Sequence, residues 1–105
     1  MSDKSKSSLD AIDHIAITVD NIKEAVAWYQ DHFKCAVVYQ DEGWAYLDFA
    51  NIRLAMVLAS EHPNHIGFAV KNASKYGALT KHRDGTRSVY VDDPAGNIVE
   101  MVDKM

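Results

Sequence analysis

Cysteine, proline and glycine are all scarce in this chain, whose 105 residues include one cysteine, two prolines and five glycines. Because a single thiol cannot form an internal disulfide and has no zinc-type spacing, a disulfide framework and a cysteine-bound zinc site are both excluded. One lone cysteine also fits a reducing compartment. The glycines form no phosphate-binding loop, so we predict no nucleotide or flavin site.

Long runs of one kind of residue are missing as well. The net charge is -4, from 11 basic and 15 acidic residues, and no cluster of Lys or Arg forms a basic stripe, which argues against nucleic acid as a partner. No apolar run is long enough to cross a bilayer, and no basic amphipathic helix suggests a membrane surface. Residues 1–11 are mostly polar and lack the apolar segment of a signal peptide, so we expect a short disordered lead and a cytoplasmic protein.

The first half of the chain alternates between apolar segments and turn residues. His14–Val19 is β-branched and apolar, which predicts a strand. Asn21 followed by Glu24 has the spacing of a helix cap, and apolar residues at helical spacing then extend to Phe33. Cys35 follows this helix, and we expect it to be a small core residue rather than a nucleophile. Three further strands are predicted over residues 35–40, 44–49 and 52–58, the middle one half-buried, so this half reads β-α-β-β-β.

The second half repeats this order in a shorter form. Pro63 lies in a polar connector and marks the break between the halves, because proline cannot donate to a strand ladder. A strand over His65–Val70 is followed by a weaker helical pattern from Asn72 to about Lys81. Strands over residues 86–91 and 98–102 then flank a strong turn at 93–97. Only four residues separate the helical pattern from residue 86, so this half is predicted to lack its second strand.

An internal repeat is the most informative feature of the sequence. Residues 13–21 match residues 64–72, with His aligned to His, Ile to Ile, Val to Val and Asn to Asn. Residues 51–54 also match residues 97–100. His14 and His65 are therefore equivalent, and Glu100 is equivalent to Leu54.

A duplicated module places equivalent residues around a pseudo-two-fold axis, so His14 and His65 can meet across it. Glu100, on the last strand, can share their face if the strands are neighbours. Two histidines and one carboxylate can bind a divalent metal and leave positions open for water or substrate. From these residues alone a structural alternative without a metal stays open. In it, each histidine is a surface or hydrogen-bonded residue, and Glu100 belongs to the polar face of an edge strand.

Three features of the sequence resemble the vicinal oxygen chelate superfamily, which includes glyoxalase I, bleomycin-binding proteins and extradiol dioxygenases. These features are the two His-led strands, a helix containing Trp28-Tyr29, and the segment Asp-Asp-Pro-Ala-Gly-Asn-Ile-Val-Glu at 92–100. The resemblance covers residues 12 to 103. It implies an α+β domain over residues 12–105, in which modules of about 12–60 and 63–105 form a curved mixed sheet around a cavity.

The resemblance also implies a set of metal ligands. Metal-dependent members take their ligands from the first and last strands of the modules, and His14, His65 and Glu100 match three of those positions. Leu54 occupies the fourth position, where glyoxalase I-like members place a Glu, so the remaining set is closer to that of extradiol dioxygenases and fosfomycin-modifying enzymes. Iron(II), manganese, nickel and zinc all remain open as the metal.

Three functions follow as hypotheses. The first is a metal-dependent lyase or dioxygenase in which Glu100 is a ligand and also shuttles a proton. The second is a sequestering protein of the bleomycin-resistance type, and the third is a degenerate partner domain within an oligomer. Superfamily members commonly form dimers, so we expect a homodimer that binds a small molecule. Residues proposed to line the substrate pocket are Trp44, Tyr46, Phe68 and Tyr90, while Arg53 is expected to point away and His32, His62 and His82 to be solvated.

Overall fold

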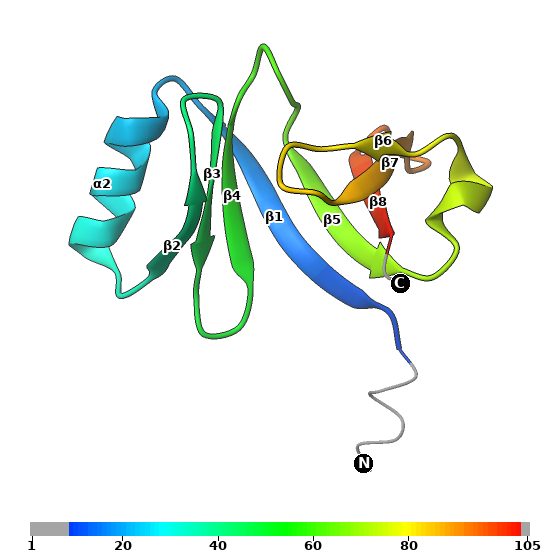
Figure 1. The fold of residues 1–105 in the computed structure, drawn as a ribbon, viewed down its shortest axis with the longest axis horizontal. Coiled ribbons are helices and arrows are strands. Elements are labelled where there is room, and N and C mark those ends of the chain that lie inside the picture. Colours follow the sequence, from blue (N-terminus) through cyan, green and yellow to red (C-terminus); the bar gives the residue numbers. More distant parts are fainter. Residues whose placement is uncertain (1–8, 104–105) are drawn as a thin grey trace. The chain divides into compact units, whose positions relative to one another are not determined.

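A computed structural model describes residues 9–103, and over these residues it contains eight strands, one α-helix and one 3-10 helix (Figure 1). The predicted α+β class is confirmed. Neither helix of the described residues is long and apolar enough to span a membrane. The elements are β1 (Ala11–Val19), α2 (Ile22–His32), β2 (Ala36–Gln40), β3 (Trp44–Asp48), β4 (Arg53–Leu58), β5 (His65–Val70), η1 (Ala73–Tyr76), β6 (Thr80–Lys81), β7 (Arg87–Asp92) and β8 (Ile98–Asp103).

The described chain divides into two compact units. The first unit is His14–Ile66, and the second comprises residues 9–13 and 67–103. Within the first unit the strand order is β2-β3-β4-β1, with β1 and β4 parallel and the other pairs antiparallel. Within the second unit the order β8-β7-β6 is antiparallel. The predicted mixed sheet therefore follows from the parallel pairing of β1 with β4. Of the predicted disordered lead, residues 1–8 lie outside the described residues, and Ala11 already belongs to β1.

The helix of the first unit begins and ends where its sequence predicts. The Asn21 side chain accepts a hydrogen bond from the backbone N–H of Glu24 at 2.9 Å, which satisfies one of the free donors of the first turn. Phe33 adopts extended backbone angles and its N–H bonds the carbonyl of Tyr29, so the helix stops at His32. Figure 1 shows α2 lying along β2 and β3, where it buries Ile22 and Val26.

Strand β3 carries the core of the first unit on both of its faces. Ala45 and Leu47 are fully buried against α2 together with Met56 of β4. On the opposite face, Tyr46 packs with Ala16 and Ala55 in a second cluster. The prediction of a half-buried strand is therefore wrong, because aromatic side chains cover the face that was expected to meet solvent. Each fully buried large side chain contributes about 1.5–3 kcal/mol.

The second unit departs from its predicted elements between Asn72 and Lys81. The predicted helix is wrong, since only the 3-10 turn η1 forms there. Asn72 has φ 59°, in the left-handed region, so it does not act as a helix cap. Gly77 follows with φ 148°, and a Cβ at this position would lie 3.1 Å from Val89, so the chain turns away after four residues.

The residues freed from that helix form a short strand. Thr80–Lys81 is β6, whose Thr80 pairs with Ser88 of β7. The prediction that the second module lacks its second strand is therefore wrong, although the strand is only two residues long. The module remains the shorter of the two, as predicted.

Candidate metal centre

The structure brings His14 and His65 together inside the first unit. His14 lies on β1 with 2% of its surface exposed, and His65 begins β5 with 7% exposed. Their Nε2 atoms are 3.3 Å apart, and the rings meet edge to face at a centroid distance of 5.4 Å. Two buried imidazole nitrogens thus point at one another.

Backbone contacts fix which nitrogen of His65 is available to a ligand. Its Nδ1 lies 2.7 Å from the carbonyl oxygen of Pro63, and a carbonyl only accepts, so Nδ1 carries the hydrogen. In the neutral ring, Nε2 then keeps its lone pair. The side chain of Asn64 accepts a hydrogen bond from the backbone N–H of Thr18 at 2.7 Å, which ties the start of β5 to β1.

The spacing of the two histidines fits a shared metal ion. Zinc and similar ions bind imidazole nitrogen at about 2.0–2.1 Å. Two nitrogens 3.3 Å apart can both reach one ion at that distance with an angle near tetrahedral. The hydrogen bond from His65 Nδ1 to a carbonyl is the kind of contact that orients metal-binding histidines.

Aromatic side chains extend from the histidine pair within the first unit. The Tyr46 ring lies 5.7 Å from that of His14, and Trp44 lies 5.4 Å from Tyr46. His62 stacks on Trp44 at 5.7 Å with an interplanar angle of 17°. His62 is half-buried, so the prediction that it is solvated is wrong. Its polar surroundings in the sequence gave no signal for this stacking, which depends on where the loop returns to β3.

Strand register corrects the predicted roles of Leu54 and Arg53. In the ladder between β1 and β4, His14 pairs with Arg53 and Ile15 pairs with Leu54. Paired residues share a face, so Leu54 lies on the face that packs against α2, not on the histidine face. Leu54 is therefore not the missing ligand position.

Arg53, predicted to point away, lies on the histidine face instead. Its guanidinium sits 5.1 Å from the centre of the Tyr46 ring and pairs with Asp48 at 2.8 Å. The prediction assumed that Leu54 faces the histidines, so that its neighbour Arg53 points away. The repeat alignment of residues 51–54 is offset by one residue from the strand register, and the faces of the two side chains are therefore reversed.

Glu100 is buried in the second unit, with 5% of its surface exposed. It lies on β8 opposite Tyr90 of β7, so these two side chains share a face. Val89, whose side chain lies where a Cβ on Gly77 beside η1 would point, belongs to the other face. Glu100 thus faces away from η1, just as His14 faces away from α2. Burial, and secondarily the charge of Glu100, raise the pKa of Tyr90 well above its ordinary value.

Two polar side chains hold the carboxylate of Glu100. Ser88 Oγ lies 2.5 Å from Oε2 of Glu100, and Nε2 of His82 lies 2.6 Å from Ser88 Oγ. The prediction that His82 is solvated is wrong, since its side chain is only 10% exposed. Ser88 was not predicted as a site residue, because a serine within a strand carries no distinguishing spacing.

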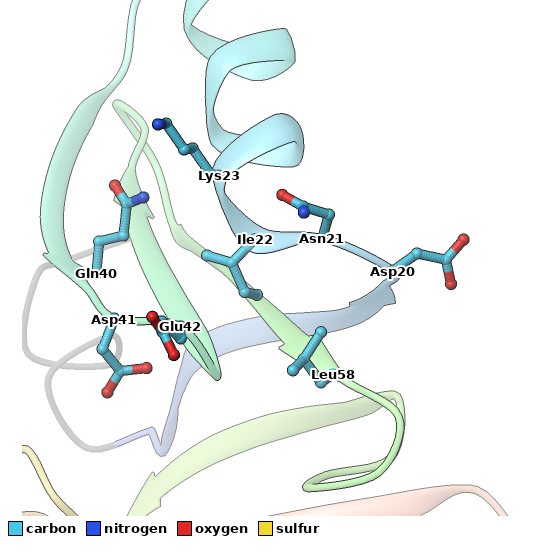
Figure 2. A pocket seen from close by; sticks show the side chains of 8 residues that line it. All are labelled: Asp20, Asn21, Ile22, Lys23, Gln40, Asp41, Glu42 and Leu58. Atoms are coloured by element: carbon cyan, nitrogen blue, oxygen red, sulfur yellow. The ribbon is translucent and has the colours of Figure 1, made fainter.

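The remaining candidates lie apart from these groups. Burial along β5 alternates, so Phe68 shares a face with Ile66 and is opposite to His65, which argues against a pocket role. His32 is exposed, as predicted, and stacks on Trp28 at 3.9 Å. A pocket of about 640 Å³ in the first unit contains none of the predicted site residues. Figure 2 shows its lining, which consists of Asp20, Asn21, Ile22, Lys23, Gln40, Asp41, Glu42 and Leu58.

Comparison with known proteins agrees with this architecture. The hypothetical protein BH1468 from Bacillus halodurans C-125 is similar at a TM-score of 0.76 with 14% identity, covering 91% of this chain and 95% of that chain. Methylmalonyl-CoA epimerase from Mycobacterium tuberculosis is similar at 0.70 with 17% identity, covering 90% and 87%. A glyoxalase/bleomycin resistance protein/dioxygenase superfamily member from Vibrio splendidus 12B01 is similar at 0.66 with 13% identity, covering 91% and 100%.

At these identities the likeness shows the fold. No curated protein matches the sequence. A family model does match residues 11–75, more than half of the chain. This chain therefore belongs to the Glyoxalase/Bleomycin resistance protein/Dioxygenase superfamily.

Proposed function

We propose that this protein is a divalent-metal-dependent enzyme acting on a small oxygen-chelating substrate, of the lyase or dioxygenase type. His14, His65 and Glu100 are the proposed ligands, and each is buried and offers one ligand atom. The observation that carries the proposal is the buried histidine pair with its Nε2 atoms 3.3 Å apart.

The histidine pair supports metal binding through the energetics of burial. A buried polar group is costly unless it is partnered, and a carbonyl already takes the hydrogen on Nδ1 of His65. The Nε2 atom of that ring can then only accept. That Nε2 lies 3.3 Å from Nε2 of His14, and a cation bound between the two atoms would replace this contact and be held by both lone pairs.

Glu100 supports the proposal from the second unit. Its carboxylate accepts a hydrogen bond from Ser88, as an ionised ligand does, and it faces away from the helical side of its module. The sequence repeat and the family resemblance both assign it to the last strand of the module, where superfamily members place a ligand. Two imidazoles and one carboxylate suit iron, manganese, nickel and zinc, and they leave coordination positions for substrate oxygens.

A bound metal would supply Lewis acidity to a substrate that chelates it through two oxygens. The protein's own residues would orient that substrate. The Arg53 guanidinium, whose side chain is 35% exposed, lies over the Tyr46 ring on the same face as His14, so it is the residue best placed to meet a substrate oxygen.

Metal content is the test. Elemental analysis of untagged protein purified without chelator should find about one equivalent of divalent metal per chain in wild type, and His65→Ala should lose it. His32→Ala is the matched control, because His32 is an exposed histidine of the same unit. A chain that carries no metal, and retains none after soaking in iron(II), manganese, nickel or zinc, would refute the proposal. If metal is bound, the metal-loaded protein would be screened with catechols and 2-oxoaldehydes.

A sequestering function is the second candidate, and the aromatic residues near His14 are its support. Trp44 and Tyr46 contact one another, but they are only 5% and 9% exposed. Rings buried this deeply serve as core and leave little surface for an apolar ligand, so catalysis is the better-supported proposal. Metal-free protein that binds an aromatic ligand tightly would reverse this ranking.

We also propose that the enzyme acts in the cytoplasm as a homodimer. The free thiol of Cys35 suits a reducing compartment. Strand β2 forms the outer edge of the first unit and leaves Val37 39% and Val38 47% exposed, so it is open to a second copy. Size-exclusion chromatography with light scattering distinguishes a dimer from a monomer of 11.7 kDa.

A further inference from the structure

A continuous chain of polar side chains is buried in the second unit around Glu100. Ser88 is 1% exposed, and the side chains of His82 and Glu100 are 10% and 7% exposed. Nε2 of His82 lies 2.6 Å from Ser88 Oγ, and Ser88 Oγ lies 2.5 Å from Oε2 of Glu100. The same Nε2 is 3.4 Å from Oε2. Ser88 and His82 therefore both converge on one oxygen of the Glu100 carboxylate.

The direction of these hydrogen bonds follows from the available protons. An ionised carboxylate only accepts, so the single hydroxyl hydrogen of Ser88 is donated to Glu100. The oxygen of Ser88 must then accept from His82, whose hydrogen lies on Nε2. Hydrogen bonds to a charged acceptor are about twice as strong as those between neutral groups, so this chain holds the carboxylate firmly.

A nucleophilic role for Ser88 does not fit this arrangement. An activated serine gives its proton to a histidine and must reach the substrate. Here the serine donates to the carboxylate, and it lies between His82 and Glu100 rather than at the end of the chain.

The short strand β6 explains how His82 reaches this position. Thr80 pairs with Ser88, which aligns β6 beside β7. His82 follows directly, and its N–H bonds the carbonyl of Thr86 at 2.7 Å while its carbonyl accepts from Gly85 at 3.0 Å. The β6–β7 turn thus holds the backbone of His82 at both its donor and its acceptor, which directs the ring toward Ser88.

We propose that Ser88 and His82 are positioning residues for Glu100, holding its Oε2 and so fixing the orientation of the carboxylate that would bind the metal. This inference rests on the proposed metal site and deepens it. A carboxylate that is held in one orientation would be a fixed ligand for the metal. Loss of such supporting contacts lowers metal affinity by about 10–100-fold in metalloproteins.

Cobalt(II) binding to the full-length protein tests the assignment. Metal-free wild type is titrated with Co²⁺ in competition with a chelating dye, and the visible absorption of bound Co²⁺ reports the ligand geometry. We expect Ser88→Ala to weaken binding by about 10–100-fold and to change the absorption spectrum. His82→Ala should weaken it less, and His82→Gln should restore it because the amide still donates to Ser88. Thr86→Ala is the control, since it removes a turn contact to Asp84 without touching the His82 ring.

Each outcome decides between the proposals. Wild-type affinity and spectrum in both Ser88→Ala and His82→Ala, with binding lost in Glu100→Gln, would overturn the positioning role and leave the metal site standing. Wild-type protein that binds no Co²⁺ would instead overturn the metal site, and the positioning role with it. Circular dichroism identifies a Ser88→Ala protein that fails to fold, and the comparison of His82→Ala with His82→Gln then carries the test.

Discussion

The two units of this protein have related sequences, but they bury different kinds of side chain. Leu47, Met56 and Val57, three of the four largest fully buried side chains, belong to the first unit and are apolar. The fourth, Ser88, belongs to the second unit and is polar. The first unit packs an eleven-residue helix on its sheet, whereas the second has only a 3-10 turn of four residues. Duplication has thus produced one module stabilised by apolar packing and one organised around a buried carboxylate.

The largest expected effect tests that difference in packing. Leu47→Ala should lower the free energy of unfolding by about 2–5 kcal/mol, because it removes a fully buried side chain and leaves a cavity. Val102→Ala in the second unit should cost only about 1–2 kcal/mol, since fewer buried methyl groups are lost. Urea denaturation followed by circular dichroism measures both values.

Equal losses in the two variants would contradict the comparison. In that case the second unit would depend on its small apolar core as much as the first does on Leu47. Hydrogen exchange of the β3 and β8 amides adds a unit-by-unit measurement, with stronger protection expected in β3.

A second, smaller effect tests the face on which each residue of β4 lies. Leu54→Glu places a carboxylate against α2 and should destabilise the protein by about 1–3 kcal/mol without raising metal affinity. Arg53→Glu should cost about 1 kcal/mol, since it removes a partly exposed ion pair and places a second carboxylate opposite Asp48. It should raise Co²⁺ affinity, because its side chain shares the face of His14.

Charge alone also attracts a cation, so Arg53→Gln is the matched control. If a carboxylate at position 53 acts as a ligand, Arg53→Glu should exceed Arg53→Gln in affinity and should also alter the Co²⁺ spectrum. A gain in affinity from Leu54→Glu would show instead that the repeat alignment, and not the strand register, identifies the equivalent of Glu100.

The sequence was sufficient to predict most of the first unit and the pairing of its histidines. Asn21 with Glu24 set the helix start, and β-branched runs set the strands, because these signals are local. The repeat made His14 and His65 equivalent, and the structure brings their Nε2 atoms together. The repeat and the family resemblance identified Glu100 as a candidate, since the segment leading to it has a distinctive turn.

Other features depend on contacts that no local pattern carries. A one-residue offset in the repeat alignment reversed the faces of Arg53 and Leu54, because side chains alternate at every position of a strand. The prediction of the second helix was wrong because Asn72 and Gly77, both with positive φ, delimit a segment that is too short for an α-helix. His82 and Ser88 are six residues apart in a turn and a strand, and only the β6–β7 pairing brings them to Glu100.

The smallest expected effect concerns the turns that join the last two strands of each module. In the second unit Asp93 accepts hydrogen bonds from the N–H groups of Ala95 and Asn97 at 2.9 and 2.8 Å, and its other oxygen accepts from the Asn97 side chain. The hydrogen bond from the Asn97 side chain, together with those from the backbone, lowers the pKa of Asp93. In the turn of the first unit, Phe49 donates to the carbonyl of Ile52 at 3.1 Å, at the place that Asp93 occupies in the second.

The lowered pKa gives this turn a predictable response to acid. A carboxyl with a lower pKa in the folded state stabilises the protein above its unfolded pKa of about 3.9, and that stability is lost as the pH falls through the folded value. Asp93→Asn should therefore lower the melting temperature modestly at pH 6, and the two proteins should converge as the pH approaches 2. Asp31→Asn, which removes an exposed charge from α2, should not show this convergence. A difference between wild type and Asp93→Asn that persists unchanged at pH 2 would mean that the charge of Asp93 does not stabilise the turn, and that the two modules close their last hairpins by the same backbone contacts.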